Sequence, residues 1–226
     1  MPSASKITCF LFNIVLLILS GCNSNPAQND DATNTGNTSQ PVNPADTITK
    51  GGILSEKQAK QLIELRAIET LALLSQNNMA GLVRFVHPDK GLRFSPYSYV
   101  QPDTDLKFNP RQIAQLAQDK TMYHWGSYDG SGDPIELTYN DYRKKFVTGK
   151  DYLSQSDSIG FNRIIGTGNS LNNRTEIYPN ALIVEFYQAG KHPDYGGMDW
   201  GSLALVFEKY QSEWLLVAVI HNSWTS

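Results

Sequence analysis

Cys22 is the residue whose surroundings most directly predict a covalent chemistry. It follows Leu19, Ser20 and Gly21 at the end of an apolar run. Two small side chains before the cysteine would let a signal peptidase reach the peptide bond, and the thiol is a nucleophile that can take up diacylglycerol as a thioether. Cleavage would make Cys22 the N-terminus, with an amine open to acylation. Several long acyl chains, at about 0.8 kcal/mol per buried methylene, hold a protein firmly on a bilayer.

The residues before Cys22 have the layout of an export signal. Lys6 supplies a positive charge, and the apolar run 10–19 would rise only about 15 Å as a helix, about half of a hydrocarbon core. With residues 19–22, this pattern matches the lipobox of bacterial lipoproteins. We therefore predict that residues 1–21 are a lipoprotein signal peptide and that lipid on Cys22 anchors the chain at the extracytoplasmic face of the cell membrane. Two alternatives remain, a signal peptide cut elsewhere and an uncleaved membrane anchor.

Four residues in the rest of the chain are our candidates for ligand binding: Tyr97, Trp125, Asp129 and His221. Tyrosine and tryptophan combine a large apolar area with a polar tip, and a few polar side chains fix the orientation of a ligand in a pocket. The same residue types also serve an ordinary core, or hold a structure together by hydrogen bonds. We predict no catalytic residue, because a general base needs a geometry and a tuned pKa that a sequence does not reveal.

Other motifs give weaker signals. Asp129, Ser131 and Asp133 alternate like the opening of a calcium loop, but Pro134 stands where such a loop needs glycine, so a polar hairpin turn is favoured. Residues 166–169 are glycine-rich but lack the lysine of a phosphate-binding loop. The four histidines show no zinc-binding helix spacing. We therefore expect neither a metal nor a cofactor.

Charge and cysteine content limit the classes of partner that the chain could bind and the chemistry that its folded part could perform. The chain has 19 basic and 22 acidic residues, and removal of Lys6 with the signal peptide would leave a net charge of −4. Because no basic patch stands out, we expect no nucleic-acid partner. Cys9 would leave with the signal peptide and Cys22 would carry lipid, so the folded part would have no thiol for disulfides or catalysis.

The chain divides into a linker and one domain. Residues 23–50 are almost entirely small, polar or proline, and such a segment cannot bury enough apolar area to offset the entropy of ordering. We interpret residues 22–50 as the lipidated cysteine and a disordered linker. Residues 51–226 are long enough for a single packed domain.

Helices are expected first in that domain. Ser55 and Gln58 form a capping-box pattern at the start of a long helix. Two rows follow at helical spacing, which predicts a wide-faced, well-buried helix. One row has Leu62, Leu65, Ile68 or Glu69, and Ala72, and the other has Ile63, Ala67, Leu71 and Leu74. Further helices are expected over 79–86, over 110–118 and after Thr138.

Strands dominate the last third. Residues 159–165 and 181–187 are rich in β-forming side chains, and 203–210 and 214–221 flank a short turn as a hairpin. Residues 121–127 and 135–137 indicate a further pair of strands. Helices followed by long antiparallel strands predict an α+β fold.

Five stretches carry a family resemblance: residues 87–97, 125–134, 168–170, 198–200 and 220–225. Together they resemble a C-terminal domain of uncharacterised secreted and lipid-anchored proteins of Gram-positive bacteria, over nearly all of residues 51–226. More distantly, the layout is similar to the nuclear-transport-factor-2-like fold. That likeness implies N-terminal helices packed on a curved, cone-like antiparallel sheet with a pocket, and it leaves the use of the pocket open.

We therefore expect a membrane-anchored, non-enzymatic domain that binds a small molecule, a peptide or a cell-wall component. The alternative is a small cone-fold isomerase or hydrolase that uses a histidine or aspartate as general base. A deep cavity with a buried carboxylate or histidine against a tyrosine would favour the enzyme. A cavity filled by its own aromatic side chains would favour binding. A third possibility is a module that dimerises through an open sheet face.

Overall fold

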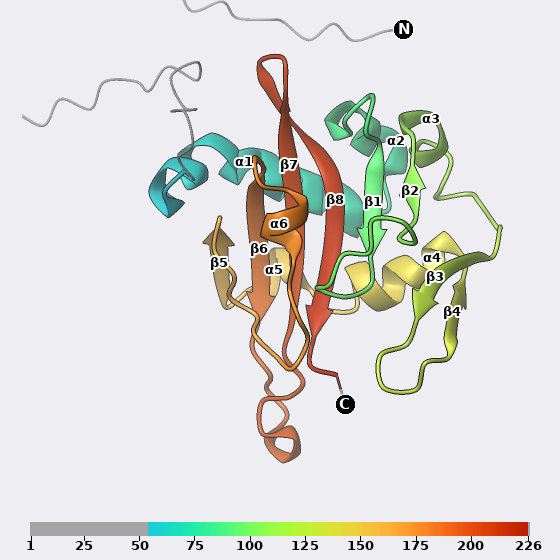
Figure 1. Ribbon diagram of the computed structural model, residues 1–226, viewed down its shortest axis with the longest axis vertical. Coiled ribbons are helices and arrows are strands. Elements are labelled where there is room, and N and C mark those ends of the chain that lie inside the picture. Colours follow the sequence, from blue (N-terminus) through green and yellow to red (C-terminus); the bar gives the residue numbers. More distant parts are fainter. Residues whose placement is uncertain (1–53, 226) are drawn as a thin grey trace, which may run out of the picture. The chain divides into compact units, whose positions relative to one another are not determined.

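The computed structural model describes residues 54–225, which form a mixed α+β domain (Figure 1). The predicted signal peptide 1–21, the predicted lipidation of Cys22 and the predicted linker 22–50 lie outside the described residues. Within residues 54–225, no helix has the length and apolar character needed to cross a membrane.

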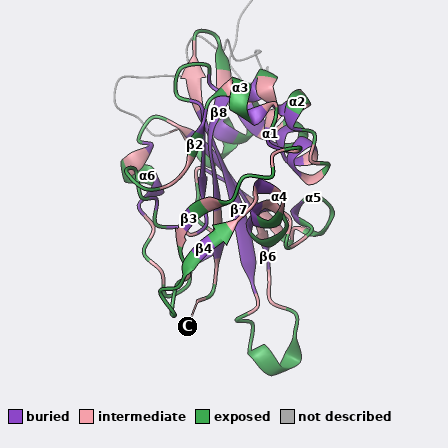
Figure 2. Cartoon of the chain, turned by 90° about the vertical axis from the view of Figure 1, so that its right-hand side faces the viewer, coloured by how far each residue is buried: buried purple, intermediate pink, exposed green. Residues whose placement is uncertain are grey.

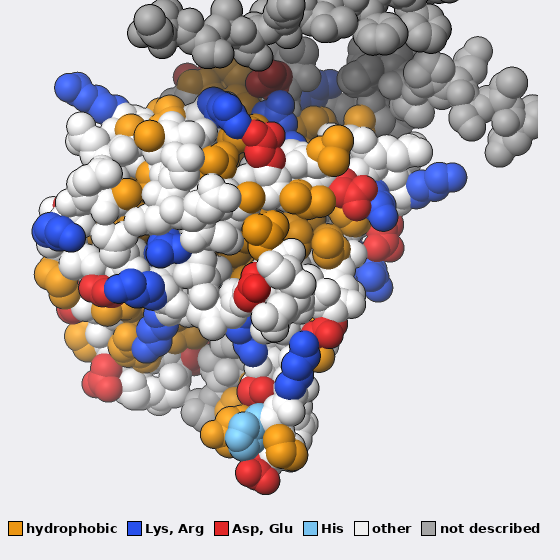
Figure 3. All heavy atoms as spheres, turned by 180° about the vertical axis from the view of Figure 1, so that it is seen from behind, with side chains coloured by type: hydrophobic (Ala, Val, Ile, Leu, Met, Phe, Trp, Pro, Cys, Tyr) orange, Lys and Arg blue, Asp and Glu red, His pale blue; other side chains and the backbone are white. Residues whose placement is uncertain are grey.

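Helix α1 (Glu56–Ser75) begins as predicted. The Ser55 side chain accepts from the Gln58 amide and the Gln58 side chain accepts from the Ser55 amide. The row of Ile63, Ala67, Leu71 and Leu74 is buried. The prediction of a wide buried face was wrong, because Leu65 is 84% exposed and Ile68 is 39% exposed. Only one side of α1 is therefore buried in the core. The space-filling view from behind shows hydrophobic side chains exposed on that face of the molecule (Figure 3).

The remaining helices are short. They are α2 (Met79–Leu82), the 3-10 turn η2 (Val83–Phe85), α3 (Pro110–Ile113), α4 (Tyr139–Tyr142), the π-helical turn η3 (Arg143–Val147), α5 (Tyr152–Gln155), α6 (Arg174–Ile177) and the 3-10 turn η4 (Pro193–Tyr195). Helix α3 has the proline-led start that the sequence indicates but stops after four residues, well before residue 118. Thr138 caps α4 as expected.

A six-stranded sheet has the order β2-β1-β8-β7-β6-β5. Its strands are β1 (Leu92–Ser95), β2 (Lys107–Phe108), β5 (Ser158–Phe161), β6 (Leu182–Gln188), β7 (Gly201–Tyr210) and β8 (Glu213–Ser223). All neighbours are antiparallel except β1 and β8, which run parallel. Strands β3 (Tyr123–Ser127) and β4 (Pro134–Leu137) form a separate hairpin.

The β7–β8 hairpin confirms the sequence prediction and extends it at both ends. Gln211 takes a positive φ of 54° in the turn. The pairing is regular except at one bulge, where Val206 pairs with Ala218 and Phe207 with Leu216. Val217 is therefore an extra residue on β8.

The two faces of the sheet have different covers. The helix-covered face packs against α1 and the short helices α2 to α5, and the loop-covered face lies under the segment that contains α6 (Figures 1 and 2). Strand alternation sends Leu203 and Leu205 to the helix-covered face and Ala204 and Val206 to the loop-covered face. Both faces are therefore buried, which explains the near-continuous apolar character of β6, β7 and β8.

Aromatic side chains fill the space between the helix-covered face and the β3–β4 hairpin. The Trp125 ring stacks on Tyr142 with centroids 3.8 Å apart. Phe94 makes edge contacts with both rings and with Tyr139, at 5.6–6.2 Å. All four side chains are at most 1% exposed. The region where a cone-shaped fold could hold a central cavity is thus occupied by the protein's own side chains.

Candidate functional site

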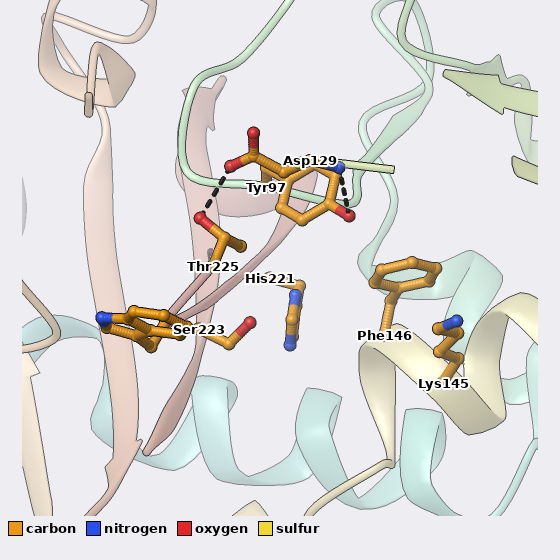
Figure 4. Close-up of a pocket in the computed structure, with 8 residues that line it drawn as sticks. Tyr97, Asp129, Lys145, Phe146, His221, Ser223 and Thr225 are labelled. Atoms are coloured by element: carbon orange, nitrogen blue, oxygen red, sulfur yellow. Dashed lines mark hydrogen bonds between the residues drawn. The ribbon is translucent and has the colours of Figure 1, made fainter. Parts of the chain in front are cut away.

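A pocket of about 410 Å³ lies at the C-terminal end of β8 (Figure 4). Its lining combines aromatic, hydroxyl and charged side chains: Tyr97, Asp129, Lys145, Phe146, His221, Ser223, Trp224 and Thr225. The structure thus brings together three of the four candidate ligand contacts, Tyr97, Asp129 and His221. They are separated by up to 124 positions in the sequence and come from three different segments.

The fourth candidate, Trp125, lies elsewhere. It is 1% exposed, and its indole Nε1 donates a hydrogen bond to the Leu137 carbonyl at 2.9 Å. Its ring stacks on Tyr142 in the core, and it does not line this pocket. Trp125 therefore has the ordinary core role that its residue type also allows.

Local backbone structure positions the lining. Alternation along β8 places His221 and Ser223 on the same side as Val219, the helix-covered side. Lys145 and Phe146 come from η3, where the Thr148 amide donates to the Arg143 carbonyl at 2.8 Å across five residues. Such π-helical turns are rare and are frequent at functional sites.

His221 is held in one protonation state. Its Nδ1 lies 2.9 Å from the Pro96 carbonyl oxygen, which can only accept, so Nδ1 carries the proton. Burial lowers the pKa of His221 to about 4, and the Lys150 ammonium also favours the neutral form. At neutral pH the imidazole is therefore uncharged and Nε2 is a hydrogen-bond acceptor. No hydrogen bond to Nε2 is formed within residues 54–225.

Tyr97 adds a hydroxyl donor beside the histidine. Its oxygen accepts from the Asp129 amide at 3.1 Å, and its ring meets the edge of Phe146 at 6.1 Å. Burial raises the pKa of Tyr97, so the hydroxyl keeps its proton at neutral pH. Because the backbone amide uses an oxygen lone pair, the hydroxyl hydrogen is available to a ligand.

Lys145 is a cation without an acidic partner in the described part of the chain. Its Nζ lies 4.1 Å from the centre of the Tyr128 ring and 5.7 Å from that of Phe146. These distances fit cation–π contacts, which orient the ammonium without neutralising it.

Side-chain hydrogen bonds hold the segment after β8 in place. The Thr225 hydroxyl donates to Asp129 Oδ2 at 2.7 Å, and the Asn169 side chain donates to the Thr225 carbonyl. Ser170 lies within 3.2 Å of the Thr225 hydroxyl. The pocket wall therefore depends on contacts between three segments that are distant in sequence.

Five lining residues lie outside our four candidates: Lys145, Phe146, Ser223, Trp224 and Thr225. Ser223 could have been found, since it lies two positions after His221 on one strand and must share its face. Lys145 and Phe146 carry no such signal, because the π-helical turn sets their direction. Within residues 54–225, no group of three or more histidine, aspartate or glutamate side chains could hold a metal ion.

Comparisons with known proteins do not identify a family for this chain. No family model matches the chain and no curated protein matches it, so membership of the Gram-positive lipoprotein-domain family stays a prediction. A solved structure whose title begins Rd1NTF2_05, a designed nuclear-transport-factor-2-like protein, is 14% identical and covers 70% of this chain and 96% of that chain. Its TM-score is 0.27, and a likeness at that level carries no argument. The mixed α+β class itself is clear from the structure.

Proposed function

We propose that this chain is a lipid-anchored extracytoplasmic protein whose domain binds a ligand in the pocket at the end of β8. The observation that carries the proposal is a set of three unused polar groups around one pocket: the Nε2 acceptor of His221, the hydroxyl hydrogen of Tyr97 and the ammonium of Lys145. A volume of about 410 Å³ falls within the range of small-molecule sites.

Binding is better supported than catalysis. A histidine whose pKa is about 4 is a hydrogen-bond acceptor and only a weak base at neutral pH. The Asp129 carboxylate already accepts from Thr225, and Ser223 makes no hydrogen bond to His221 in the described residues. The nucleophile–base contact that would favour a hydrolase is therefore missing from this pocket.

We also propose that the domain has the nuclear-transport-factor-2-like fold. The long helix α1 comes first, the long β7–β8 hairpin comes last, and the six-stranded sheet packs against α1. This order of elements supports the proposal without any argument from a similar solved structure.

Fragment screening by NMR tests the binding site. With the chain from residue 22 onward carrying Cys22→Ser, we expect polar fragments to shift the signals of His221, Ser223 and the Trp224 indole. Ser223→Phe should fill the pocket and abolish these shifts. Ser212→Phe, in the exposed β7–β8 turn, is the matched control and should leave them unchanged. Fragment binding that survives Ser223→Phe would contradict the proposed site.

Metabolic labelling tests the anchor. Radiolabelled palmitate should enter the wild-type chain, and Cys22→Ser should abolish the label and release the protein from the membrane fraction. Cys9→Ser should change neither, because Cys9 belongs to the predicted signal peptide. A wild-type chain that never takes up palmitate would rule out lipidation at Cys22.

A further inference from the structure

We infer that the pocket at the end of β8 takes an acidic saccharide, meaning a sugar ring that bears a carboxylate. The inference rests on the proposed binding function and names its ligand class. Three features of the lining carry it: an unneutralised cation, a mixture of hydrogen-bond donors and acceptors, and an exposed indole.

Lys145 favours an anionic group on its own side of the pocket, and the Asp129 carboxylate, which also lines the pocket, accepts a hydrogen bond from Thr225. Lys145 has no acidic partner in the described residues, and it lies at the pocket edge on η3. The same geometry argues against a cationic ligand, because the faces of Tyr128 and Phe146 already hold the Lys145 ammonium. A second cation over these rings would meet a like charge. An anionic group, in contrast, would complete an ion pair.

Hydroxyl recognition follows from the mixed lining. At neutral pH His221 Nε2 can only accept, the Tyr97 hydroxyl can donate, and the Ser223 hydroxyl can do both. An apolar ligand would leave these groups without partners, which is unfavourable once water is excluded. Sugar hydroxyls donate and accept at once, so they suit such a lining. Figure 4 shows Lys145 and Ser223 on opposite sides of His221, so the polar contacts span the pocket.

Trp224 offers a surface for the ring itself. Its side chain is 39% exposed and has no aromatic partner in the described residues. The C–H groups on one face of a sugar ring are apolar and fit an indole, whose amphipathic character suits partly wet sites. Trp125 and Trp200, by comparison, are buried.

Two sugars that differ at a single carbon provide the test. Glucuronate carries a carboxylate where glucose carries a hydroxymethyl group, so the pair isolates the charge. We expect NMR titration of the chain from residue 22 with Cys22→Ser to show glucuronate binding at least about tenfold tighter than glucose, the ratio a charge-assisted hydrogen bond supplies. The preference should shrink as salt is raised, because the lysine is exposed.

Neighbouring lysines provide a matched pair of variants. Lys145→Gln should reduce glucuronate affinity to the level of glucose and leave glucose binding unchanged. Lys144→Gln should change neither, because Lys144 is outside the lining and lies 3.6 Å from Asp141. Equal affinity for both sugars in the wild type, or equal effects of the two variants, would overturn the acidic character of the ligand.

Failure of this inference is distinguishable from failure of the binding proposal. If neither sugar shifts the signals of His221 or Trp224, the saccharide class is wrong. The fragment screen with Ser223→Phe then decides separately whether the pocket binds any ligand.

Discussion

The two faces of the central sheet are both buried, yet they are built from different chemistry. The helix-covered face is lined by aliphatic and aromatic side chains such as Leu205, Phe94 and Phe186. The loop-covered face has a smaller apolar cluster and two buried ion pairs, Arg174–Glu185 and Arg93–Asp105. The difference follows from what covers each face.

Loops bring backbone groups that need partners, whereas a helix satisfies most of its own. On the loop-covered face Glu185 accepts from the amides of Ile165 and Gly166, at 3.0 and 3.1 Å. Asn222 donates to the Gly166 carbonyl at 3.0 Å. Arg93 donates to the carbonyls of residues 101 and 102. The polar side chains under the loops therefore provide the hydrogen bonds to loop backbone groups that secondary structure would otherwise provide.

The largest effect is expected from breaking the buried pair. The distance from Arg174 Nη2 to Glu185 Oε2 is 2.5 Å, and the two side chains are 2% and 0% exposed. Glu185→Ala leaves a buried guanidinium uncompensated, so we expect the free energy of unfolding to fall by about 3–5 kcal/mol in urea denaturation. The exposed pair His124–Glu136 is the control, and Glu136→Ala should cost less than about 1 kcal/mol. Similar losses for both would contradict the contrast between buried and exposed pairs.

A pH dependence is expected on the helix-covered side. The folded-state pKa of His221 is lowered to about 4 from 6.5, so the unfolded chain binds the proton first. Stability from this group is therefore full above about pH 6.5 and is lost as the pH falls to 4, by up to about 3 kcal/mol. Urea denaturation at each pH measures this loss.

His221→Asn, which keeps a donor for the Pro96 carbonyl, should flatten this part of the stability curve. His124→Asn, at an exposed position of β3, is the matched control and should not flatten it. An unchanged slope in His221→Asn would show that the histidine is not buried in its neutral form.

Replacing the whole buried pair sharpens the comparison. Simple buried ion pairs can often be replaced by apolar residues without loss. Here we expect the double variant Arg174→Met, Glu185→Leu to remain about 2 kcal/mol less stable than wild type in urea denaturation, because the amides of Ile165 and Gly166 lose their acceptor. A double variant as stable as wild type would show that the ion pair does not stabilise the loop through the amides of Ile165 and Gly166.

The smallest effect is expected where the covering loop meets the pocket. Thr225→Val removes the donor to Asp129 and should lower the free energy of unfolding by about 1 kcal/mol. Thr104→Val, which removes a 3.3 Å contact to Gln101, should change it less. NMR signals of Asn169 should shift in the first variant alone. Unperturbed Asn169 signals would mean that the contact does not hold the loop.

The sequence predicts the fold best where local signals decide it. The capping box at Ser55 predicts the start of α1, and the turn signal at 211–213 predicts the β7–β8 hairpin. The structure confirms both. The predicted wide buried face of α1 is wrong at Leu65, because periodicity identifies an apolar row but does not show whether another element packs on it. The short α3 shows the same limit, since a good cap starts a helix but tertiary packing decides its length.

The candidate site was only partly predictable for a related reason. Residue type was enough to single out Tyr97, Asp129 and His221, but it also selected Trp125, which the structure buries. Distinguishing them requires the pairing of β1 with β8, a contact between residues more than a hundred positions apart. The position of Lys145 in the pocket is set by a π-helical turn that no local sequence pattern predicts.

The extra residue Val217 has a consequence for the chemistry of the pocket. Every side chain of β8 after the bulge faces the opposite way from the direction that unbroken alternation from Leu216 would give. If Val217 were paired in regular alternation and not bulged, Asn222 would face the pocket, and His221 and Ser223 would lie beneath the covering loop. The bulge at Val217 thus determines whether an imidazole or a carboxamide faces the ligand.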